Sequence, residues 1–289
     1  MSANAVEIRG LEKKFSSFAL GPLDMTVPRG AIYGFVGPNG AGKTTTIDLI
    51  FGMGSKDAGS IRVLGLDHER DEVAMKRQVA YVGPDLLFAP WGRVHKAIKF
   101  VRGFYSSWDD AYCERLMKTL DIGANDKIQT LSFGSRIKLA LLLALPWRPQ
   151  VLILDEPTVG LDAISKQALF AELLAAVQDE DRTILISSHG LADVERFADH
   201  VGMIKQGRLL FEGSMTGVVS RFRMVDFVSR DDAIAGHPGL LVQRRDGDRW
   251  RVLLDQQRLP VERLTSLGVS LVADMPVTLE ELFIGVGRS

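Results

Sequence analysis

Residues 37–45 constrain this chain most, because their glycines, lysine and threonines fit a phosphate-binding loop. They read Gly-Pro-Asn-Gly-Ala-Gly-Lys-Thr-Thr, so a glycine and four residues precede Gly-Lys-Thr. The apolar run 31–36 predicts a buried strand before the loop, and apolar residues at helical spacing follow it. Glycines let successive N–H groups face an anion, and the helix dipole adds positive charge. The stretch therefore predicts a site for a nucleoside triphosphate.

Two side chains of this loop have specific predicted roles. Lys43 can reach the β- and γ-phosphates, and the hydroxyl of Thr44 suits Mg²⁺. A glycine-rich turn with a surface lysine is the alternative, but the flanking strand and helix argue against it. The loop residues predicted to contact the nucleotide are Gly37, Pro38, Asn39, Gly40, Ala41, Gly42, Lys43, Thr44 and Thr45.

Composition limits the possible partners and compartments. The 289 residues suffice for one large domain plus a small one, and a net charge of −1 gives no reason to expect a nucleic-acid partner. The single cysteine, Cys113, excludes an internal disulfide, suits a reducing cytosol and is expected to be a small apolar helix residue. No signal peptide is expected, and the most apolar segment, residues 139–147, is too short to span a membrane. Any membrane role would therefore need a partner.

A second group of polar residues follows predicted strands. The apolar run 151–154 indicates a central parallel strand, and Asp155 and Glu156 come directly after it. They are expected at the edge of an open α/β sheet where ligands bind, and burying them without a nearby cation would be costly. A further strand, ending at His189, is predicted from residue 183. Alternating strands and helices predict a largely parallel sheet.

The remaining regions differ in character. Residues 6–27 predict a strand hairpin, and residues 88–147 are helical in pattern. Seven aromatic residues lie between positions 88 and 112; they form either the core of a helical subdomain or a groove for a partner helix, and both can hold. Residues 221–289 contain ten Arg, no Lys and ten acidic residues. Short strand-like runs there predict a small α+β appendage over residues 220–289.

Together these features resemble the ATP-binding cassette subunits of ABC transporters over roughly residues 4–215. Residues 131–135, Leu-Ser-Phe-Gly-Ser, are similar to the family signature Leu-Ser-Gly-Gly-Gln, and residues 159–162 are similar to its D-loop. The resemblance implies an α/β fold: a phosphate-loop NTPase core with a mainly parallel sheet, an antiparallel β subdomain and a helical signature subdomain at about 88–147, followed by the appendage.

The resemblance also implies an ATPase with Mg²⁺ as cofactor and assigns roles within one cassette. Phe15 would stack on adenine, its alternative being a core residue at a strand end. Asp155 would contact Mg²⁺ with Thr44, and Glu156 would act as general base toward the attacking water. His189 would join Lys43 at the γ-phosphate, its alternative being a buried histidine held by backbone groups.

The resemblance implies two protein partners. Ser132 and Gly134 would cap the ATP bound to a second cassette in a head-to-tail dimer. ATP would close this homodimer or heterodimer and hydrolysis would reopen it, driving a separate membrane permease. The cassette would then be cytoplasmic and peripheral on the inner face of the membrane. Residues 276–283 resemble the ending of single-cassette bacterial drug and antibiotic efflux subunits, which favours export.

Two departures from the family pattern stand out. The signature has Phe133 and Ser135 where the family usually has glycine and glutamine. The family also has a glutamine after the strand that ends at Val82, whereas this chain continues Gly-Pro-Asp. Asp85 is the candidate replacement as an oxygen ligand to Mg²⁺. This change leaves one alternative open, a non-transport or regulatory ABC ATPase with weak hydrolysis.

Overall fold

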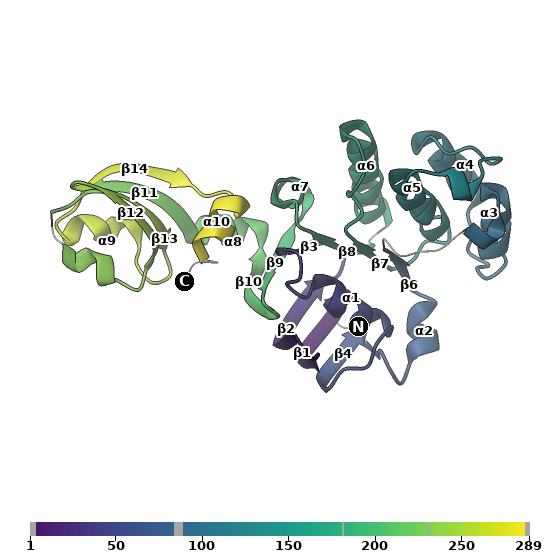
Figure 1. The fold of residues 1–289 in the computed structure, drawn as a ribbon, viewed down its shortest axis with the longest axis horizontal. Coiled ribbons are helices and arrows are strands. Elements are labelled where there is room, and N and C mark those ends of the chain that lie inside the picture. The colour runs from purple at the N-terminus through teal and green to yellow at the C-terminus, as the bar shows by residue number, and fades with distance from the viewer. Residues whose placement is uncertain (1–3, 84–88, 181, 231, 287–289) are drawn as a thin grey trace.

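A computed structural model describes residues 4–83, 89–180, 182–230 and 232–286. In Figure 1 a helical region lies at one end, two sheets lie in the middle, and a third sheet with its own helices lies at the other end. In the described residues, no helix combines the length and the apolar character that crossing a bilayer requires.

The central sheet has six strands in the order β10-β9-β3-β8-β7-β6. All neighbours pair in parallel except β9 and β10, which form an antiparallel hairpin that turns at residues 206 and 207. Every residue of β3, β7 and β8 is buried, as their apolar sequences predict. Because β3 and β7 both pair with β8, the segments that follow these strands meet at one sheet edge. The strands are β3 (Ile32–Val36), β6 (Val79–Val82), β7 (Val151–Asp155), β8 (Thr183–Ser188), β9 (His200–Lys205) and β10 (Arg208–Ser214).

A second, antiparallel sheet covers the phosphate-loop helix α1 (Lys43–Phe51) and has the order β2-β1-β4-β5. The predicted hairpin is confirmed, with Ile8 opposite Met25 on one side and Ile61 on the other. Its apolar side chains share a core with Phe35 of β3 and Ile47 of α1. The strands are β1 (Asn4–Lys14), β2 (Ala19–Pro28), β4 (Ala58–Val63) and β5 (Leu66–Asp67), and the short helix α2 (Glu72–Lys76) follows them.

The region from residue 89 to 147 is helical, as predicted, and α5 packs beside β6. Cys113 is buried in α4, and burial, with Asp110 and Glu114 nearby, raises the pKa of its thiol to about 11. It is therefore a poor nucleophile at neutral pH. The helices are α3 (Val94–Arg102), α4 (Asp110–Thr119), α5 (Phe133–Ala144), and two 3₁₀ turns, η1 (Ala89–Trp91) and η2 (Ile128–Thr130). The chain then forms α6 (Ala163–Glu180) and α7 (Leu191–Phe197) around β8.

The aromatic residues of this region divide between core and surface. Tyr112 is buried, and Tyr105 stacks on Trp147 with ring centroids 4.2 Å apart. Phe100 and Phe104, by contrast, are 49% and 70% exposed and contact each other edge to face. The core hypothesis is confirmed for the buried residues, the groove for a partner helix stays a prediction, and Phe88 lies outside the described part of the chain.

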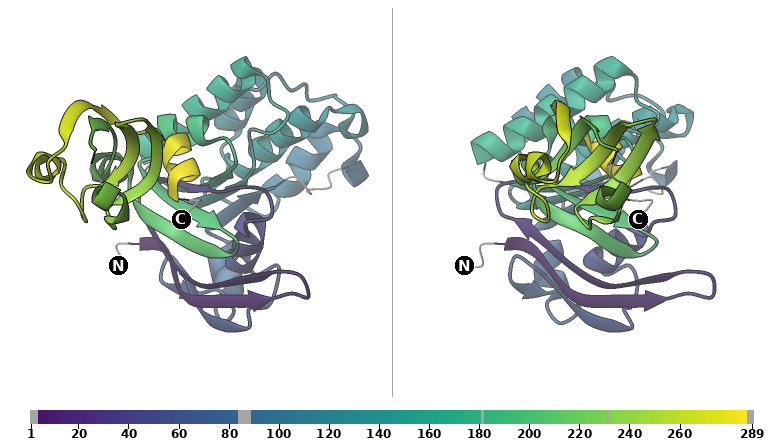
Figure 2. Two further views of the ribbon diagram at one scale, coloured as in Figure 1. Left: turned by 60° about the vertical axis from the view of Figure 1, so that its left-hand side comes forward. Right: turned by 90° about the vertical axis from the view of Figure 1, so that its left-hand side faces the viewer.

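The predicted C-terminal α+β unit is a four-stranded sheet of order β12-β13-β11-β14 with its own core. Inside that core Phe227 stacks on Trp250. The unit is joined to the rest by α10, whose Leu279 and Leu282 pack with Val36 and Val194; Figures 1 and 2 show α10, in yellow, at this junction. The elements are α8 (Met215–Arg221), β11 (Phe222–Val228), η3 (Asp232–Gly236), β12 (Leu240–Asp246), β13 (Arg249–Asp255), α9 (Val261–Ser266), β14 (Ser270–Pro276) and α10 (Leu279–Val286).

Candidate functional site

The phosphate loop connects β3 to α1, and its shape requires glycine. Gly40 and Gly42 have φ angles of 76° and 109°, which side chains rarely adopt. A Cβ on Gly37 would lie 2.2 Å from the carbonyl oxygen of Ile204, so the loop passes directly against β9. Gly42 has no side chain to cap α1, so the first N–H groups of the helix remain available to an anion.

Lys43 lies over this loop with its side chain only 6% exposed. Its Nζ donates hydrogen bonds to the carbonyl oxygens of Gly37 at 2.8 Å and Pro38 at 3.3 Å. The same nitrogen lies 3.2 Å from Oε1 of Glu156. The ammonium group is thus held at the loop, where β- and γ-phosphates would bind.

Asp155 ends β7 fully buried, and two hydroxyl groups contact it. Thr44 Oγ1 donates to one carboxylate oxygen at 2.8 Å, and Ser187 Oγ donates to the other. Ser187 lies directly opposite Asp155 on β8 and also accepts the N–H of Glu156 at 3.0 Å. Mg²⁺ in nucleotide sites is held by few protein oxygens plus phosphates and water. The donor set formed by Thr44 and Asp155 fits that ion.

Glu156 contacts both candidate γ-phosphate residues, Lys43 and His189. Its Oε1 faces Lys43, and its Oε2 lies 2.8 Å from Nδ1 of His189. The backbone of Glu156 has a φ angle of 50°, which is uncommon for a residue with a side chain. This conformation carries about 1–3 kcal/mol of backbone strain, and it turns the carboxylate toward the loop. His189 follows β8, which ends at Ser188, and is 53% exposed. Its ring is therefore not buried against backbone groups.

A cavity of about 460 Å³ lies in front of this cluster. Phe18 lines it from the turn between β1 and β2, whereas Phe15 does not line it and is 51% exposed. Phe15 lies just beyond the end of β1, and its ring centroid is 6.3 Å from that of Phe18. The lining residues are Ser17, Phe18, Asn39, Gly40, Gly42, Lys43, Thr44, Thr45 and Glu156. Sequence reasoning named neither Ser17 nor Phe18 as a site residue.

Ser132 and Gly134 belong to a different surface. Ser132 is the N-cap of α5, where its Oγ accepts the N–H of Ser135 at 3.1 Å. A Cβ on Gly134 would lie 2.6 Å from the carbonyl oxygen of Gly160, so the helix start packs directly on the D-loop turn. Phe133 covers the other side of Gly160, since its ring lies 2.9 Å from where a Cβ on that glycine would be. Phe133, the substituted signature residue, therefore packs against the D-loop.

The D-loop is also fixed at its end. Asp162 Oδ1 accepts the N–H of Ser165 at 2.7 Å, and this hydrogen bond lowers the pKa of the carboxyl group.

Of the predicted site residues, the structure brings Lys43, Thr44, Asp155, Glu156 and His189 together. It keeps Ser132 and Gly134 off the lining of the 460 Å³ cavity. Asp85 lies outside the described residues.

Comparison with known proteins identifies the family. The model of the family described as ABC transporter matches residues 20–159. Three similar proteins are the ABC transporter ATP-binding protein YtrB of Bacillus subtilis (27% identity, 96% of this chain and 97% of the relative), the Nod factor export ATP-binding protein I of Burkholderia lata (34%, 74% and 72%) and the daunorubicin/doxorubicin resistance ATP-binding protein DrrA of Streptomyces peucetius (30%, 91% and 84%).

Solved structures agree on the fold. An ATP-binding subunit of an ABC transporter superposes with a TM-score of 0.68 at 25% identity, covering 75% of this chain and 92% of that one. The cbiO1 protein of Clostridium perfringens superposes with a TM-score of 0.63 at 24% identity, covering 76% and 92%. These findings confirm the predicted fold class and resemblance. The chain belongs to the ABC transporter family, and it is an ATP-binding subunit with the ATPase activity of that family.

Proposed function

We propose that this ATPase subunit powers export by pairing with a second cassette and with a separate membrane permease. The observation that carries the proposal is the separation of two functional groups on one chain. Lys43, Thr44, Asp155 and Glu156 converge at the sheet edge, whereas Ser132 caps the start of α5 and does not line their cavity. A second chain would supply the missing cap. Catalysis is assigned to residues 4–215, and residues 220–289 form a separate accessory domain.

The direction of transport is proposed from the relatives. Their names include a Nod factor export protein, a lantibiotic transport protein and a daunorubicin/doxorubicin resistance protein. Among these, DrrA matches 91% of this chain, so the likeness includes much of the accessory domain. We therefore infer an exporter of the drug or antibiotic type, whose cassette is cytoplasmic and held at the inner face of the membrane by its permease.

The geometry supports a defined mechanism for ATP hydrolysis. The triphosphate would lie against backbone N–H groups of the phosphate loop and the first turn of α1, with Lys43 at its β- and γ-phosphates and the Thr44–Asp155 pair as ligands to Mg²⁺. Bound Mg²⁺ would neutralise phosphate charge. Glu156 would take the proton of the attacking water, and His189 would contact the γ-phosphate; their contacts beside Lys43 support these roles.

The ion pairs of Glu156 suggest how ATP prepares the base. Its carboxylate now contacts both Lys43 and His189. A γ-phosphate carries more negative charge and would compete for both groups. Glu156 would then lose these partners and become free to accept a proton from water. Nucleotide binding thus both supplies the substrate and releases the base.

The decisive experiment is transport by the complete complex. The chain is expressed with a candidate polytopic permease, and ATP-dependent accumulation of a fluorescent amphipathic drug is measured in inverted vesicles. Accumulation should require ATP, Mg²⁺ and both proteins, because motion of the cassettes drives the permease. The competing hypothesis, a regulatory ABC ATPase with weak hydrolysis, predicts no membrane partner and no uptake.

The roles of Phe15 and Phe18 can be distinguished by comparing two ligands, one with and one without an adenine base. Phe15→Ala should weaken ATP binding by about 5-fold to 150-fold, the range of base stacking, and leave tripolyphosphate binding unchanged. Phe18→Ala should weaken both ligands, because the Phe18 ring lies 3.0 Å from where a Cβ on Gly42 would be and thus contacts the phosphate loop. Titration calorimetry with both ligands gives the comparison.

A matched control is Phe100→Ala, because Phe100 is 49% exposed against 51% for Phe15 and does not line the cavity. It should change neither affinity. If Phe15→Ala left ATP binding intact and Phe18→Ala weakened only ATP, the stacking residue would be Phe18 instead.

A further inference from the structure

The accessory domain uses arginine as its only long cation, and four of these arginines pair with carboxylates in the described residues. Residues 221–289 contain ten Arg and no Lys. Arg221 and Arg251 each form a two-pronged pair with an aspartate, Asp255 and Asp226 respectively, and Arg223 pairs with Asp274. The planar guanidinium group matches a carboxylate or phosphate with two parallel hydrogen bonds. An arginine of this domain without such an internal partner could therefore bind an anion from solution.

Arg244 departs from this pattern. It lies on β12 directly opposite Arg251 of β13, and like charges at such a position are destabilising. The two carboxylate oxygens of Asp226 accept hydrogen bonds from Nε and Nη2 of Arg251, at 2.7 Å each. Among the residues that the structure describes, no carboxylate lies within ion-pair distance of Arg244, which is exposed. Its guanidinium group therefore keeps unused donors beside a second positive charge.

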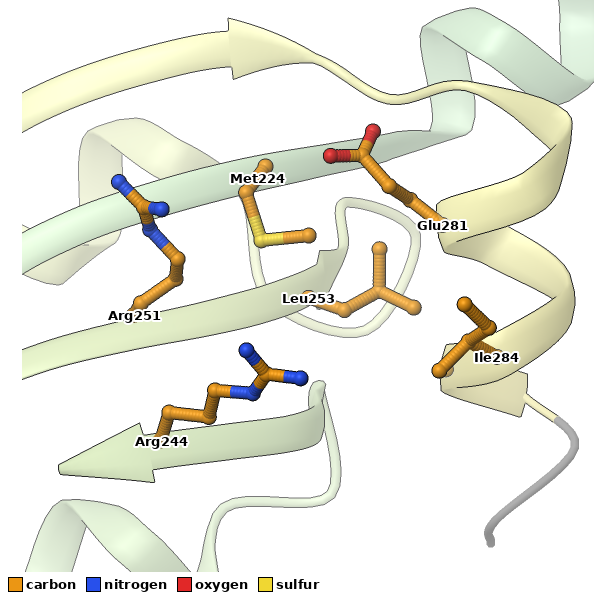
Figure 3. A pocket seen from close by; sticks show the side chains of 7 residues that line it. Met224, Arg244, Arg251, Leu253, Glu281 and Ile284 are labelled. Atoms are coloured by element: carbon orange, nitrogen blue, oxygen red, sulfur yellow. The ribbon is translucent and has the colours of Figure 1, made fainter.

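A crevice of about 160 Å³ opens next to Arg244, between the sheet and α10. Met224, Leu253 and Ile284 give it apolar walls, as Figure 3 shows. The one carboxylate at this crevice, Glu281, accepts hydrogen bonds from the N–H and the hydroxyl of Thr278 at 2.9 and 3.0 Å. It caps its own helix and, in Figure 3, lies away from the guanidinium group of Arg244.

The charge around the crevice is positive on the other side as well. A larger adjoining cavity of about 500 Å³ shares Arg244 and Arg251 and adds Arg245 and Arg249. The carboxylates that line it are Asp226, already paired, and Asp246. Across both cavities, four guanidinium groups face three carboxylates, Asp226, Asp246 and Glu281. This imbalance favours a negatively charged ligand.

We propose that this crevice binds a small organic anion with a short apolar tail. Its carboxylate or phosphate meets the free guanidinium group of Arg244, with Arg251 adding positive charge. The tail lies on Met224, Leu253 and Ile284. The site is separate from the ATP cavity and does not depend on the export function proposed above. A metabolite in solution or the headgroup of an anionic lipid could each supply this chemistry.

The test measures binding of hexanoate and hexyl phosphate to the purified full-length chain by titration calorimetry. Both should bind saturably, whereas hexan-1-ol and hexyltrimethylammonium should not, because Arg244 selects the anion. Arg244→Ala should weaken both anions about tenfold or more, the size of a charge-assisted hydrogen bond. Thermal unfolding with and without ligand gives a second readout, since a ligand of the folded state raises the Tm.

Arg249→Ala is the matched control, because Arg249 lies on the same strand as Arg251 but does not line the smaller crevice. The affinity of Arg249→Ala for hexanoate and hexyl phosphate should stay within about twofold of that of the parent chain. Ile284→Asp, which puts a like charge on the apolar wall, should also abolish binding. The absence of saturable binding up to about 10 mM, equal losses in both Arg variants, or equal binding of hexan-1-ol would overturn the proposal.

The source of the anion is resolved by a parallel arm with vesicles containing phosphatidic acid. Binding of dissolved hexyl phosphate alone identifies a soluble ligand, and Arg244-dependent binding to the vesicles as well identifies a lipid headgroup. Either result supports the crevice as the site. Vesicle binding that Arg244→Ala leaves unchanged counts against it.

Discussion

Glu156→Gln should lower ATP turnover by about 10²-fold to 10⁴-fold, the contribution of a general base, while ATP binding is retained. The amide keeps the size of the side chain but cannot take a proton from water. It also removes the negative charge that now faces Lys43 and His189, so both groups are freer to bind the γ-phosphate. Phosphate release measures turnover, and calorimetry measures ATP affinity.

The same variant should accumulate an ATP-bound dimer. If hydrolysis reopens the two cassettes, blocking it leaves the closed state populated. Sedimentation velocity with ATP and Mg²⁺ should show a monomer–dimer shift for Glu156→Gln that the parent chain shows only transiently. An ATP-bound variant that stays monomeric would contradict closure driven by nucleotide.

Glu172→Gln provides the control for this substitution. This variant carries the same Glu-to-Gln substitution on α6 at a similar degree of burial, since 13% of the Glu172 side chain is exposed against 17% for Glu156. Glu172 contacts Arg115 at 3.5 Å and does not line the ATP cavity. Its turnover should match the parent. Hydrolysis at the parent rate by Glu156→Gln would show that another group is the base.

The residues that sequence reasoning brought together are those that follow apolar strands. Parallel strands end at one edge of a sheet, so Lys43, Asp155 and His189 could be placed near each other without coordinates. Ser187 could not be found this way. It is a buried serine inside an apolar strand, and its contact with Asp155 depends on the register of β7 against β8, which no local pattern specifies.

The conformation of a turn was a second feature that the sequence could not predict. Phe15 and Phe18 are close in sequence and both aromatic, so only the conformation of the turn decides which one lines the cavity. The Phe15 N–H donates to the Phe18 carbonyl oxygen at 2.8 Å, and this bond closes the turn with Phe18 toward Gly42. The packing of Phe133 on Gly160 likewise joins residues far apart in sequence.

The start of a helix can depend on a local side-chain contact in the same way. Helix α2 spans only Glu72–Lys76, although charged residues begin at Glu69. Oδ1 of Asp67 accepts the N–H groups of Glu69 and Arg70 at 3.1 Å each, which holds these residues in a turn. These bonds also lower the pKa of the Asp67 carboxyl group. A side chain that competes for backbone donors delays the helix start.

Ser132→Asp should abolish hydrolysis if Ser132 caps the ATP of a second cassette. Aspartate is as good an N-cap as serine, so the hydrogen bond from the Ser135 N–H and the start of α5 should persist. The new carboxylate would face the γ-phosphate across the dimer and repel it. ATP affinity of the isolated chain should stay unchanged, because Ser132 does not line the cavity that holds Lys43.

Two controls separate charge from structure. Ser132→Asn keeps a capping side chain without adding charge and should retain far more activity than Ser132→Asp. Ser214→Asp makes the same change at the N-cap of α8, where Ser214 Oγ accepts the N–H of Gly217 at 3.1 Å. It should hydrolyse ATP at the parent rate. Equal loss in Ser132→Asn and Ser132→Asp would point to a structural defect.

Mixing two inactive variants tests whether the site is shared between copies. Lys43→Met should be inactive because it lacks the cation held at the phosphate loop, and its signature is intact. In a dimer with Ser132→Asp, its signature faces the intact phosphate loop of the other chain, so one of two sites is complete. Random pairing at equal amounts makes half of the dimers mixed, so roughly a quarter of the parent activity should return if the sites act independently. Recovery requires that Lys43 and Ser132 act from different chains. Without recovery, two copies of this chain do not form the shared site.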